Sequence, residues 1–570
     1  ISDLNTWDIV GSQTASSFGI ELALDTRITF HGSGFGAYSG NMPTTGTISS
    51  LIIYTYQGAT LYQQETWSGF SFLVSDFRDW INTNDVTSLQ DAIFGGADTI
   101  TDASAQNDTL FGYGGDDTIT ATFGSDVDFF DGGAGTDTLV SKGNQIFTSD
   151  TLTSFERLQF ALHTGSEITL VAQFLGSQIG PGLSTTLQVV GSSAFDFIFI
   201  GVASGNLDLS GWTFSTWGPN DGINITANLG ANTLIGTSRN DSISGGVGAD
   251  DLRGGAGNDQ MYASAGAVAD GATDHMYGGV GNDQYGVFEA GDIIHENVGA
   301  GVDYAAVYIN YTMAANLDNM AMYGSALVAT GNGLNNGITG NALNNALFGM
   351  AGDDGLAGDA GNDTLRGGAG ADNLVGGTGF DTASYSTAAA RVNANLATFS
   401  GSEGDALGDA FNSIENLSGS AFNDLLTGDT GANRLSGDNG ADTLRGGGGG
   451  DKLLGGLGLD TLTGGGGSDA FVFDTAPAAA NRDTITDYNV AGDTIQIENA
   501  VFVGIGGPGV LAAAAFHIGA AAADASDRII YHSASGALYF DANGVGGAAQ
   551  IQFATLSAGL ALTAADFVVI

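Results

Sequence analysis

Acidic side chains recur at a fixed nine-residue spacing in several parts of the chain. In the most regular block, nonapeptides start at Gly419 and at every ninth residue up to Gly464. The sixth position of these nonapeptides holds Asp424, Asn433, Asp442, Asp451, Asp460 and Asp469. Two positions later each nonapeptide has an apolar residue, from Leu426 to Phe471. Carboxylate oxygens that repeat in one register are suited to hold a hard cation such as calcium.

Three further blocks repeat the pattern with less regularity. The block from Gly331 to Ala383 has the polar column Asn336, Asn345, Asp354, Asp363, Asp372 and Asp381. A block that starts at Gly236 has Asp241, Asp250 and Asp259, and it resumes after an insertion with Asp283. The first block is the least regular and contains Asp108, Asp117 and, after an insertion, Asp137. The aspartates of the four columns are the predicted metal ligands, and the neutral asparagines predict weaker sites.

Several nonapeptides carry a family resemblance. GGAGNDQMY at Gly254 and DAGNDTLRG at Asp359 resemble the G-G-x-G-x-D-x-U-x repeat of the RTX family, the hemolysin-type calcium-binding proteins. The resemblance covers four blocks, roughly two-fifths of the chain, and it implies calcium-binding β-rolls and type I secretion. The ending from Asp566 to Ile570 resembles the acidic-then-apolar C-terminal signal of such proteins. A last strand is the alternative interpretation, and both can hold together.

The residues of each repeat explain how it would position its aspartate. A triplet such as Thr-Leu-Arg forms a short strand with the apolar side chain pointing inward, and the glycines form a turn that needs positive φ. Two nonapeptides make one winding, so residues eighteen apart stack, as Asp442 over Asp460 and Asp354 over Asp372. Stacked carboxylates repel unless a dication lies between them, and calcium accepts six to eight oxygen ligands in flexible geometry. A flexible glycine linker would need no apolar column in register.

The composition supports a cation partner and excludes others. The 570 residues include 62 Asp and Glu against 13 Lys and Arg, which gives a formal charge of −49. Nucleic acid and anionic membranes are therefore implausible partners, because both are bound through basic side chains. The hydrophobic fraction of 43% supplies a core, and the absence of cysteine leaves metal as the substitute for disulfides. No basic stretch precedes an apolar segment near Ile1, so we expect no N-terminal signal peptide.

We expect an all-β fold with parallel β-roll or β-solenoid blocks, a separate N-terminal β domain and a β-rich C-terminal cap. The aromatic residues of the first segment are expected to form a core, with a carbohydrate or cell-surface site as the alternative. The predicted segments are a β-sandwich-like domain at 1–90, repeat blocks at 91–140, 232–285, 331–383 and 419–474, an intervening β domain at 141–231, calcium-free solenoid windings at 286–330, a β connector at 384–418, and a cap with secretion signal at 475–570.

No transmembrane segment is expected. The one long uncharged stretch, Val501 to Ala523, is interrupted by Pro508, five glycines and His517. A strand followed by a short alanine-rich helix from Leu511 to Phe516 fits it better than a membrane helix.

No recognised catalytic motif is found in the sequence. There is no H-E-x-x-H for zinc, no serine with glycine two residues before and after it, and no cysteine nucleophile. A glycosidase-type pair of carboxylates stays open. We therefore expect no enzyme but a secreted, extracellular or cell-surface protein that binds calcium and self-associates through it as a layer, filament, matrix or adhesin. Cell-surface polysaccharide is a candidate ligand, and the type I export machinery is a partner during secretion. The alternative is a secreted polysaccharide-active or other hydrolase that uses the repeats for secretion and folding.

Overall fold

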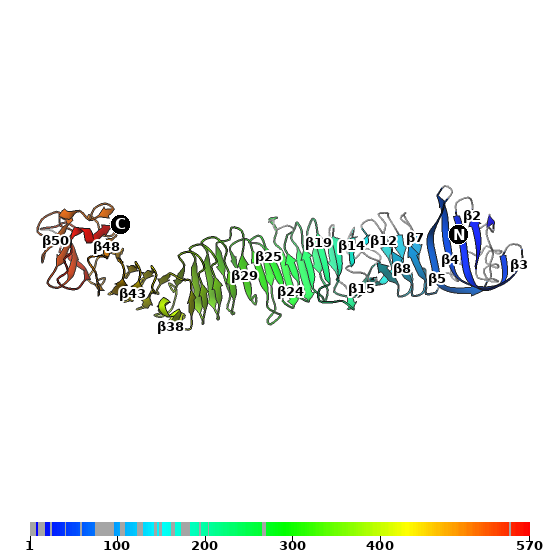
Figure 1. The fold of residues 1–570 in the computed structure, drawn as a ribbon, viewed down its shortest axis with the longest axis horizontal. Helices are drawn as coiled ribbons and strands as arrows, with labels where there is room; N and C mark the ends of the chain where they lie inside the picture. Colours follow the sequence, from blue (N-terminus) through cyan, green and yellow to red (C-terminus); the bar gives the residue numbers. More distant parts are fainter. Residues whose placement is uncertain are drawn as a thin grey trace. The chain divides into compact units, whose positions relative to one another are not determined.

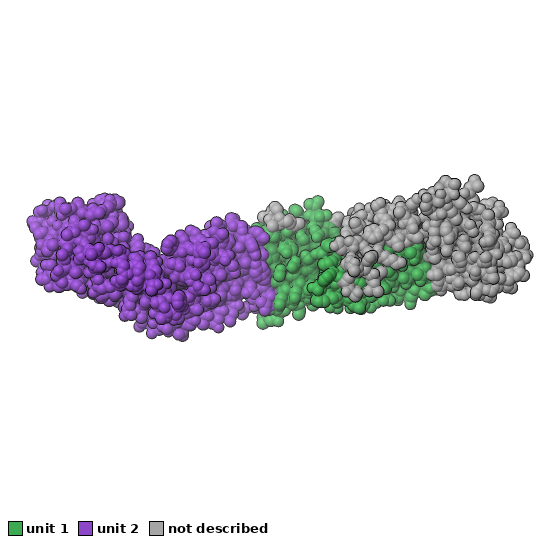
Figure 2. All heavy atoms as spheres, viewed as in Figure 1, with its two compact units in different colours: residues 1–301 green, residues 302–570 purple. Residues whose placement is uncertain are grey.

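The computed structural model describes the chain in segments, and these form two compact units, residues 1–301 and 302–570 (Figure 2). The described residues are 7–8, 17–22, 26–39, 42–57, 60–73, 96–102, 109–121, 129–141, 145–147, 151–160, 166–172, 183–192, 195–202, 205–264, 270–545 and 549–570. They contain strands and four one-turn 3-10 helices but no α-helix, and within them no helix has the length and hydropathy to cross a membrane. The predicted all-β class is confirmed.

Unit 1 begins with an antiparallel sheet. Each of its first strands pairs antiparallel with the next, and the last of them pairs antiparallel with β6 (Thr99–Asp102). These strands are β1 (Trp7–Asp8), β2 (Ser17–Leu22), β3 (Thr26–Ser39), β4 (Met42–Gln57) and β5 (Thr60–Leu73) (Figure 1). The side chains of the aromatic residues in 1–90 lie outside the described part of the chain. The division into nine segments stays a prediction.

From β6 onward, unit 1 consists of parallel ladders. One ladder continues from β6 through β8 (Thr118–Ala121), β10 (Thr138–Ser141), β13 (Phe155–Phe160), β15 (Leu183–Val190) and β18 (Thr213–Ser215). A second contains β11 (Gln145–Phe147), β14 (Ser166–Ala172), β16 (Asp196–Val202), β19 (Gly222–Ala227), β21 (Asp241–Ser244), β23 (Gln260–Tyr262) and β25 (Gln284–Val287). A third contains β17 (Asn206–Asp208), β20 (Thr233–Ile235), β22 (Asp251–Ala256), β24 (His275–Val280) and β26 (Ile293–His295), and a short one joins β12 (Thr151–Thr153), β9 (Phe129–Asp131) and β7 (Thr109–Phe111).

Unit 2 is built from two parallel ladders that the chain enters in turn. One contains β27 (Tyr304–Val307), β29 (Asn319–Met322), β31 (Gly337–Thr339), β33 (Gly355–Ala357), β35 (Asn373–Val375), β39 (Ala410–Asn412), β41 (Leu425–Thr427), β43 (Thr443–Gly448), β45 (Thr461–Gly466) and β47 (Asp483–Ile485). The other contains β28 (Tyr311–Thr312), β30 (Val328–Thr330), β32 (Ala346–Ala351), β34 (Thr364–Ala369), β36 (Thr382–Ser384), β40 (Asn416–Ser418), β42 (Arg434–Ser436), β44 (Lys452–Leu454), β46 (Ala470–Phe473) and β48 (Thr494–Ile497).

Two nonapeptides make one winding, as the sequence predicts. Leu356 of β33 is opposite Leu374 of β35, and Leu444 of β43 is opposite Leu462 of β45, both eighteen residues apart. In β33 and β35 only the middle residue is buried, so each of these two repeats contributes one leucine to the core. Burying one such side chain stabilises the fold by about 1.5–3 kcal/mol. The core is therefore a column of single residues held between two ladders.

The turns between strands need glycine at particular positions. Gly352 has φ of +118° and Gly449 has φ of +105°, which is the region that L side chains rarely adopt. A Cβ on Gly352 would also meet the backbone carbonyl of Leu334 in the previous winding. The fourth position of these nonapeptides is thus fixed as glycine by conformation and by the close approach of adjacent windings.

One insertion in unit 2 departs from the winding pattern, and regular windings resume after it. After β37 (Asn393–Asn395) the chain forms η1 (Leu396–Thr398), the antiparallel strand β38 (Ser400–Glu403) and η2 (Gly404–Ala406). The ladders close across this excursion, because β35 pairs in parallel with β39 and β37 pairs in parallel with β41. The parallel register therefore survives where the nine-residue period of the sequence is lost.

The C-terminal cap completes unit 2 with β strands. It contains β49 (Gly509–Val510), η3 (Ala513–Ala515), β50 (Phe516–Ile518), β51 (Ile529–His532), β52 (Ala537–Phe540), β53 (Ile551–Thr555), η4 (Ala564–Asp566) and β54 (Phe567–Val569). The alanine-rich helix expected at 511–516 is only one 3-10 turn, because Phe516 already starts a strand. The ending of the chain is a last strand, since β54 pairs in parallel with β48.

Candidate metal centres

The repeat aspartates lie in columns directly before the short strands. Asp354 precedes β33, and its side chain reaches back toward the winding before it. One carboxylate oxygen, Oδ1, accepts the backbone N–H of the residue eighteen positions earlier. The backbone N–H of Asp354 donates to Oδ1 of Asp372 at 2.8 Å, and that of Asp442 donates to Oδ1 of Asp460 at 2.8 Å. The predicted stacking of residues eighteen apart is therefore a ladder of backbone-to-carboxylate hydrogen bonds.

The second carboxylate oxygen of most column aspartates has no protein partner. It is buried and without a hydrogen-bond partner among the described residues, an arrangement that is costly for a carboxylate in a protein interior. The predicted ligands in this state are Asp117, Asp137, Asp250, Asp259, Asp354, Asp363, Asp372, Asp381, Asp442, Asp451 and Asp460.

All of these oxygens except that of Asp137 lie against the first glycine of their own nonapeptide. A Cβ built on Gly349 would meet Oδ2 of Asp354 and, at 2.6 Å, the backbone carbonyl oxygen of Gly367 in the next winding. Gly437 stands in the same relation to Oδ2 of Asp442 and, at 2.6 Å, to the carbonyl of Gly455. The missing side chain thus leaves a place where a carboxylate oxygen and a carbonyl oxygen of adjacent windings come close together.

The electrostatics of the column favour neutralisation. Burial raises the pKa of Asp354 to about 6, and the charges of Asp372 and Asp353 add to that rise. Burial also raises the pKa of Asp442 to about 8, against the lowering effect of the hydrogen bond from Asp424 and with the help of the Asp460 charge. A carboxylate in the column is therefore stabilised by either a proton or a cation.

The column fits calcium. Its donors are carboxylate and carbonyl oxygens, the ligands that this hard cation prefers, and the turns supply them without the strict octahedron that magnesium needs. Two observations indicate a bound cation: the buried carboxylate oxygens without a partner, and the space that the first glycine of the nonapeptide leaves beside them. Calcium bound there would supply positive charge beside buried carboxylate oxygens that have no protein partner among the described residues.

The asparagines of the columns are complete without a metal. Oδ1 of Asn345 accepts the N–H of Asn341 at 2.7 Å, and its Nδ2 donates to the carbonyl of Ala326 at 3.3 Å. Asn433 likewise accepts from Asp429 at 2.7 Å and donates to the carbonyl of Glu415 at 2.9 Å. Both amides thus close the position with protein groups, which agrees with the prediction that asparagine gives weaker sites.

Two predicted ligands at the start of blocks are also closed by protein groups. Oδ2 of Asp241 accepts the N–H of Thr237 at 2.6 Å and its hydroxyl at 3.1 Å. Both the N–H and the hydroxyl of Ser420 donate to Asp424. The threonine or serine at the second nonapeptide position therefore donates to the carboxylate oxygen that has no protein partner in the other nonapeptides.

The remaining predicted ligands are placed as follows. Asp283 is buried and accepts the N–H of Asp259 at 2.8 Å. Asp469 is buried and accepts the N–H of Asp451 at 2.9 Å. Asp108 lies outside the described residues. Which of the sixteen aspartates bind an ion stays a prediction.

The structure extends the columns to acidic residues that the periodicity missed. Oδ1 of Asp274 accepts the N–H of Asp250, twenty-four residues earlier, and Asp409 accepts the N–H of Asp372, thirty-seven residues earlier. Glu156, Glu415, Asp483 and Asp493 accept a column N–H in the same way, and Asp98 begins a column by donating its N–H to Oδ1 of Asp117. A signal exists in the sequence, because Asp98, Asp483 and Asp493 each begin an Asp-Thr-Ile triplet that places the apolar residue two positions later.

A second, exposed ladder runs beside the column. Oδ1 of Asn335 accepts the N–H of Asp353 at 2.9 Å, and Oδ1 of Asp353 accepts the N–H of Ala371 at 2.9 Å. Asn344 and Asn362 make the same kind of bond in the alternate turns. These fifth-position residues work equally well as asparagine or aspartate, so their role is to hold adjacent turns together.

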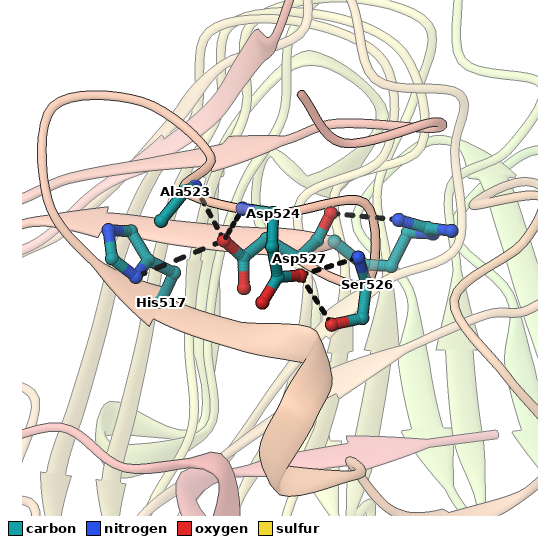
Figure 3. A network of polar contacts seen from close by, with 6 residues as sticks. His517, Ala523, Asp524, Ser526 and Asp527 are labelled. Carbon is teal, nitrogen blue, oxygen red and sulfur yellow. Dashed lines mark hydrogen bonds and ion pairs between the residues drawn. The ribbon is translucent and has the colours of Figure 1, made fainter. Parts of the chain in front are cut away.

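Serine, histidine and aspartate also meet in the C-terminal cap, in the loop between β50 and β51 (Figure 3). Nδ1 of His517 lies 3.9 Å from Oδ2 of Asp527, which also accepts the N–H of Ala523 at 2.6 Å. The hydroxyl of Ser526 donates to Asp524 at 2.5 Å instead of facing the imidazole. These bonds hold the loop closed on its own backbone, and they do not form the serine–histidine–aspartate relay of a hydrolase.

Comparison with known proteins agrees with this geometry. The model of the RTX calcium-binding nonapeptide repeat (4 copies) matches residues 93–128, 226–261, 330–365, 348–383, 409–444, 418–453 and 445–474. No curated protein matches the chain. The matched segments contain the predicted blocks 331–383 and 419–474 and cover part of the predicted blocks 91–140 and 232–285, so that Asp137 and Asp283 lie outside them. The matched segments of the chain are therefore RTX calcium-binding nonapeptide repeats.

Proposed function

We propose that this protein acts outside the cell as a structural protein that folds when calcium fills its aspartate columns. The observation that carries the proposal is the set of buried carboxylate oxygens without protein partners. Calcium outside cells, at about 10⁻³ M, would fill sites of the extracellular class with Kd of about 10⁻⁴–10⁻³ M. Because the columns exist only in the folded chain, the binding energy becomes folding energy.

Export before folding fits the same chemistry. Where calcium is scarce, the carboxylates of the columns repel one another, and the chain stays extended enough for a type I export channel. The C-terminal strand β54 pairs with β48, so an export signal at this end would be accessible only before the cap folds. The RTX repeats support this route, because the resemblance implies type I secretion.

Assembly is the proposed role of the folded protein. About eight to ten calcium ions would cancel only about 16–20 of the 49 negative charges, so the surface would stay acidic enough to recruit bridging calcium. Large apolar side chains are also exposed in unit 2, including Met350, Phe380, Phe399, Phe422 and Leu457. Exposed apolar groups and bridging cations both support contacts between copies in a layer, filament, matrix or adhesin.

Electron microscopy of the purified protein tests the proposal. Ordered sheets or filaments are expected in about 10 mM calcium, with their loss on adding a chelator. Sedimentation that shows only monomers in the same calcium concentration would refute assembly while leaving calcium binding intact. A panel of polysaccharides, esters and peptides tests the hydrolase alternative, and turnover that one Asp or Glu substitution abolishes would replace the structural role.

A further inference from the structure

One winding of unit 1 is enlarged. The column hydrogen bonds from Asp250 to Asp274 and from Asp259 to Asp283 span twenty-four residues instead of eighteen. The described segment that leads into β24, from Asp270 to Asp274, contains one glycine, Gly271. The nonapeptide pattern therefore does not explain how the enlarged winding is held in register.

Three carboxylates gather at this place. Asp270, Asp274 and Glu289 each present an oxygen, and these oxygens lie within 4.8 Å of one another. Two of the three residues, Asp270 and Glu289, stand outside the aspartate column. The cluster joins successive windings, because Oδ2 of Asp270 accepts the N–H of Gly248 at 2.6 Å and Glu289 accepts the N–H of Gly271 at 3.0 Å.

Asp274 supplies an independent sign of a ligand. Its side chain is fully buried, with 0% exposure. Oδ1 accepts the N–H of Asp250 at 2.8 Å, whereas Oδ2 is buried without a hydrogen-bond partner in the described part of the chain. The buried Oδ2 therefore lacks a hydrogen-bond donor among the described residues.

We propose that Asp270, Asp274 and Glu289 form a separate calcium site that fastens the enlarged winding to its neighbours. Three carboxylates give this site more negative charge than one column position, and water or backbone carbonyls complete the six to eight oxygens that calcium takes. The site ties the turn at Gly248, the segment from Asp270 to Asp274 and Glu289, two residues after β25, into one unit. It thereby stabilises the enlarged winding.

Calcium binding by the full chain tests the site through Glu289→Gln and Asp270→Asn. Each variant should weaken binding of one ion per chain by about tenfold or more, as measured by flow dialysis. The double variant Glu289→Gln/Asp270→Asn should affect the same single ion, whereas combining Glu289→Gln with Asp354→Asn in unit 2 should affect two. Asp208→Asn removes an exposed charge from the same unit and should leave all ions unchanged.

Unchanged binding in the single variants, or loss of two ions in the double variant, would overturn the proposal. Circular dichroism in saturating calcium shows whether the variants still fold. A crystal of the unaltered protein grown with calcium or terbium gives a second test that needs no variant. An anomalous peak between the three carboxylates is expected, and a site without one would overturn the proposal as well.

Discussion

The effect of Asp354→Asn on the free energy of unfolding should change sign between solutions with and without calcium. The amide keeps the oxygen that accepts the N–H of Asn336 at 2.7 Å, but it replaces the buried Oδ2 with an NH₂ group. The variant therefore keeps the column hydrogen bond and loses the charged oxygen offered to calcium. Its neighbour Asp353 provides a matched control, because Asp353→Asn removes the same charge from the exposed ladder, where asparagine already occurs.

The magnitude follows from linkage between binding and folding. At about 10 mM calcium, a site with Kd of about 10⁻⁴–10⁻³ M stabilises the folded state by about 1.4–2.7 kcal/mol. Asp354→Asn should lower the free energy of unfolding by that amount in calcium. In a chelator at pH 7.5 the variant should be as stable as the unaltered protein or more so, because burial raises the pKa of Asp354 to about 6 and its charge is then unfavourable.

Urea unfolding followed by circular dichroism, in calcium and in EDTA, measures both values. Asp353→Asn should stay within about 0.5 kcal/mol of the unaltered protein in both conditions. An equal loss of stability for Asp354→Asn with and without calcium would refute the reasoning, because the residue would then act only through packing and hydrogen bonds.

Three other predictions use the same measurements. Without calcium, the contribution of Asp354 and Asp442 to stability should be full below about pH 4 and should be lost as the pH rises from there through about 6 and 8, because their pKa values are raised in the folded state and their protons must leave. A rise in stability over this range would contradict the shifts. Asn433→Asp should destabilise the protein in EDTA, because it breaks the hydrogen bond that Nδ2 donates to the carbonyl of Glu415. It should strengthen calcium binding, because it adds a charged oxygen. An unchanged calcium isotherm would count against calcium binding at this column position. Gly446→Ala should cost about 1–3 kcal/mol and weaken calcium binding, because a Cβ there meets Oδ2 of Asp451, whereas Gly466→Ala, with nothing within 4 Å, should be tolerated.

Periodicity predicted much of the site because the winding and the repeat have the same length. Where two nonapeptides make a winding, the spacing places Asp354 over Asp372 and Leu356 opposite Leu374. Where an insertion enlarges a winding, the ladder still closes but the spacing no longer reveals it. Asp409 takes its place in the column thirty-seven residues after Asp372 for this reason. The nine-residue spacing predicts column members only in regular windings, whereas in the fold the backbone-to-carboxylate hydrogen bond defines the column.

The sequence pattern does not predict which protein groups bind the second carboxylate oxygen of a column aspartate, and the reason is a different one. Asp409 and Asp442 hold equivalent column positions, but the hydroxyl of Tyr385 donates to Oδ2 of Asp409 at 2.7 Å. That tyrosine lies twenty-four residues away in the sequence and meets the aspartate only because the winding returns it there. Whether a column aspartate is closed by protein or left for calcium therefore depends on tertiary contacts.

In each block of unit 2, column positions whose side chains have protein partners come first, and positions with an unpaired buried oxygen follow. The third block begins with Asn336 and Asn345, and the fourth begins with the Ser420-capped Asp424 followed by Asn433, so the column side chains of their first windings have protein partners. The windings that follow carry aspartates with an unpaired buried oxygen. Each added winding then stacks another carboxylate on the last, so the electrostatic cost without calcium grows along the block. In the function proposed above, calcium would remove that cost at every step, so we expect the folding of the later windings to depend on the metal and that of the first windings of each block to be independent of it.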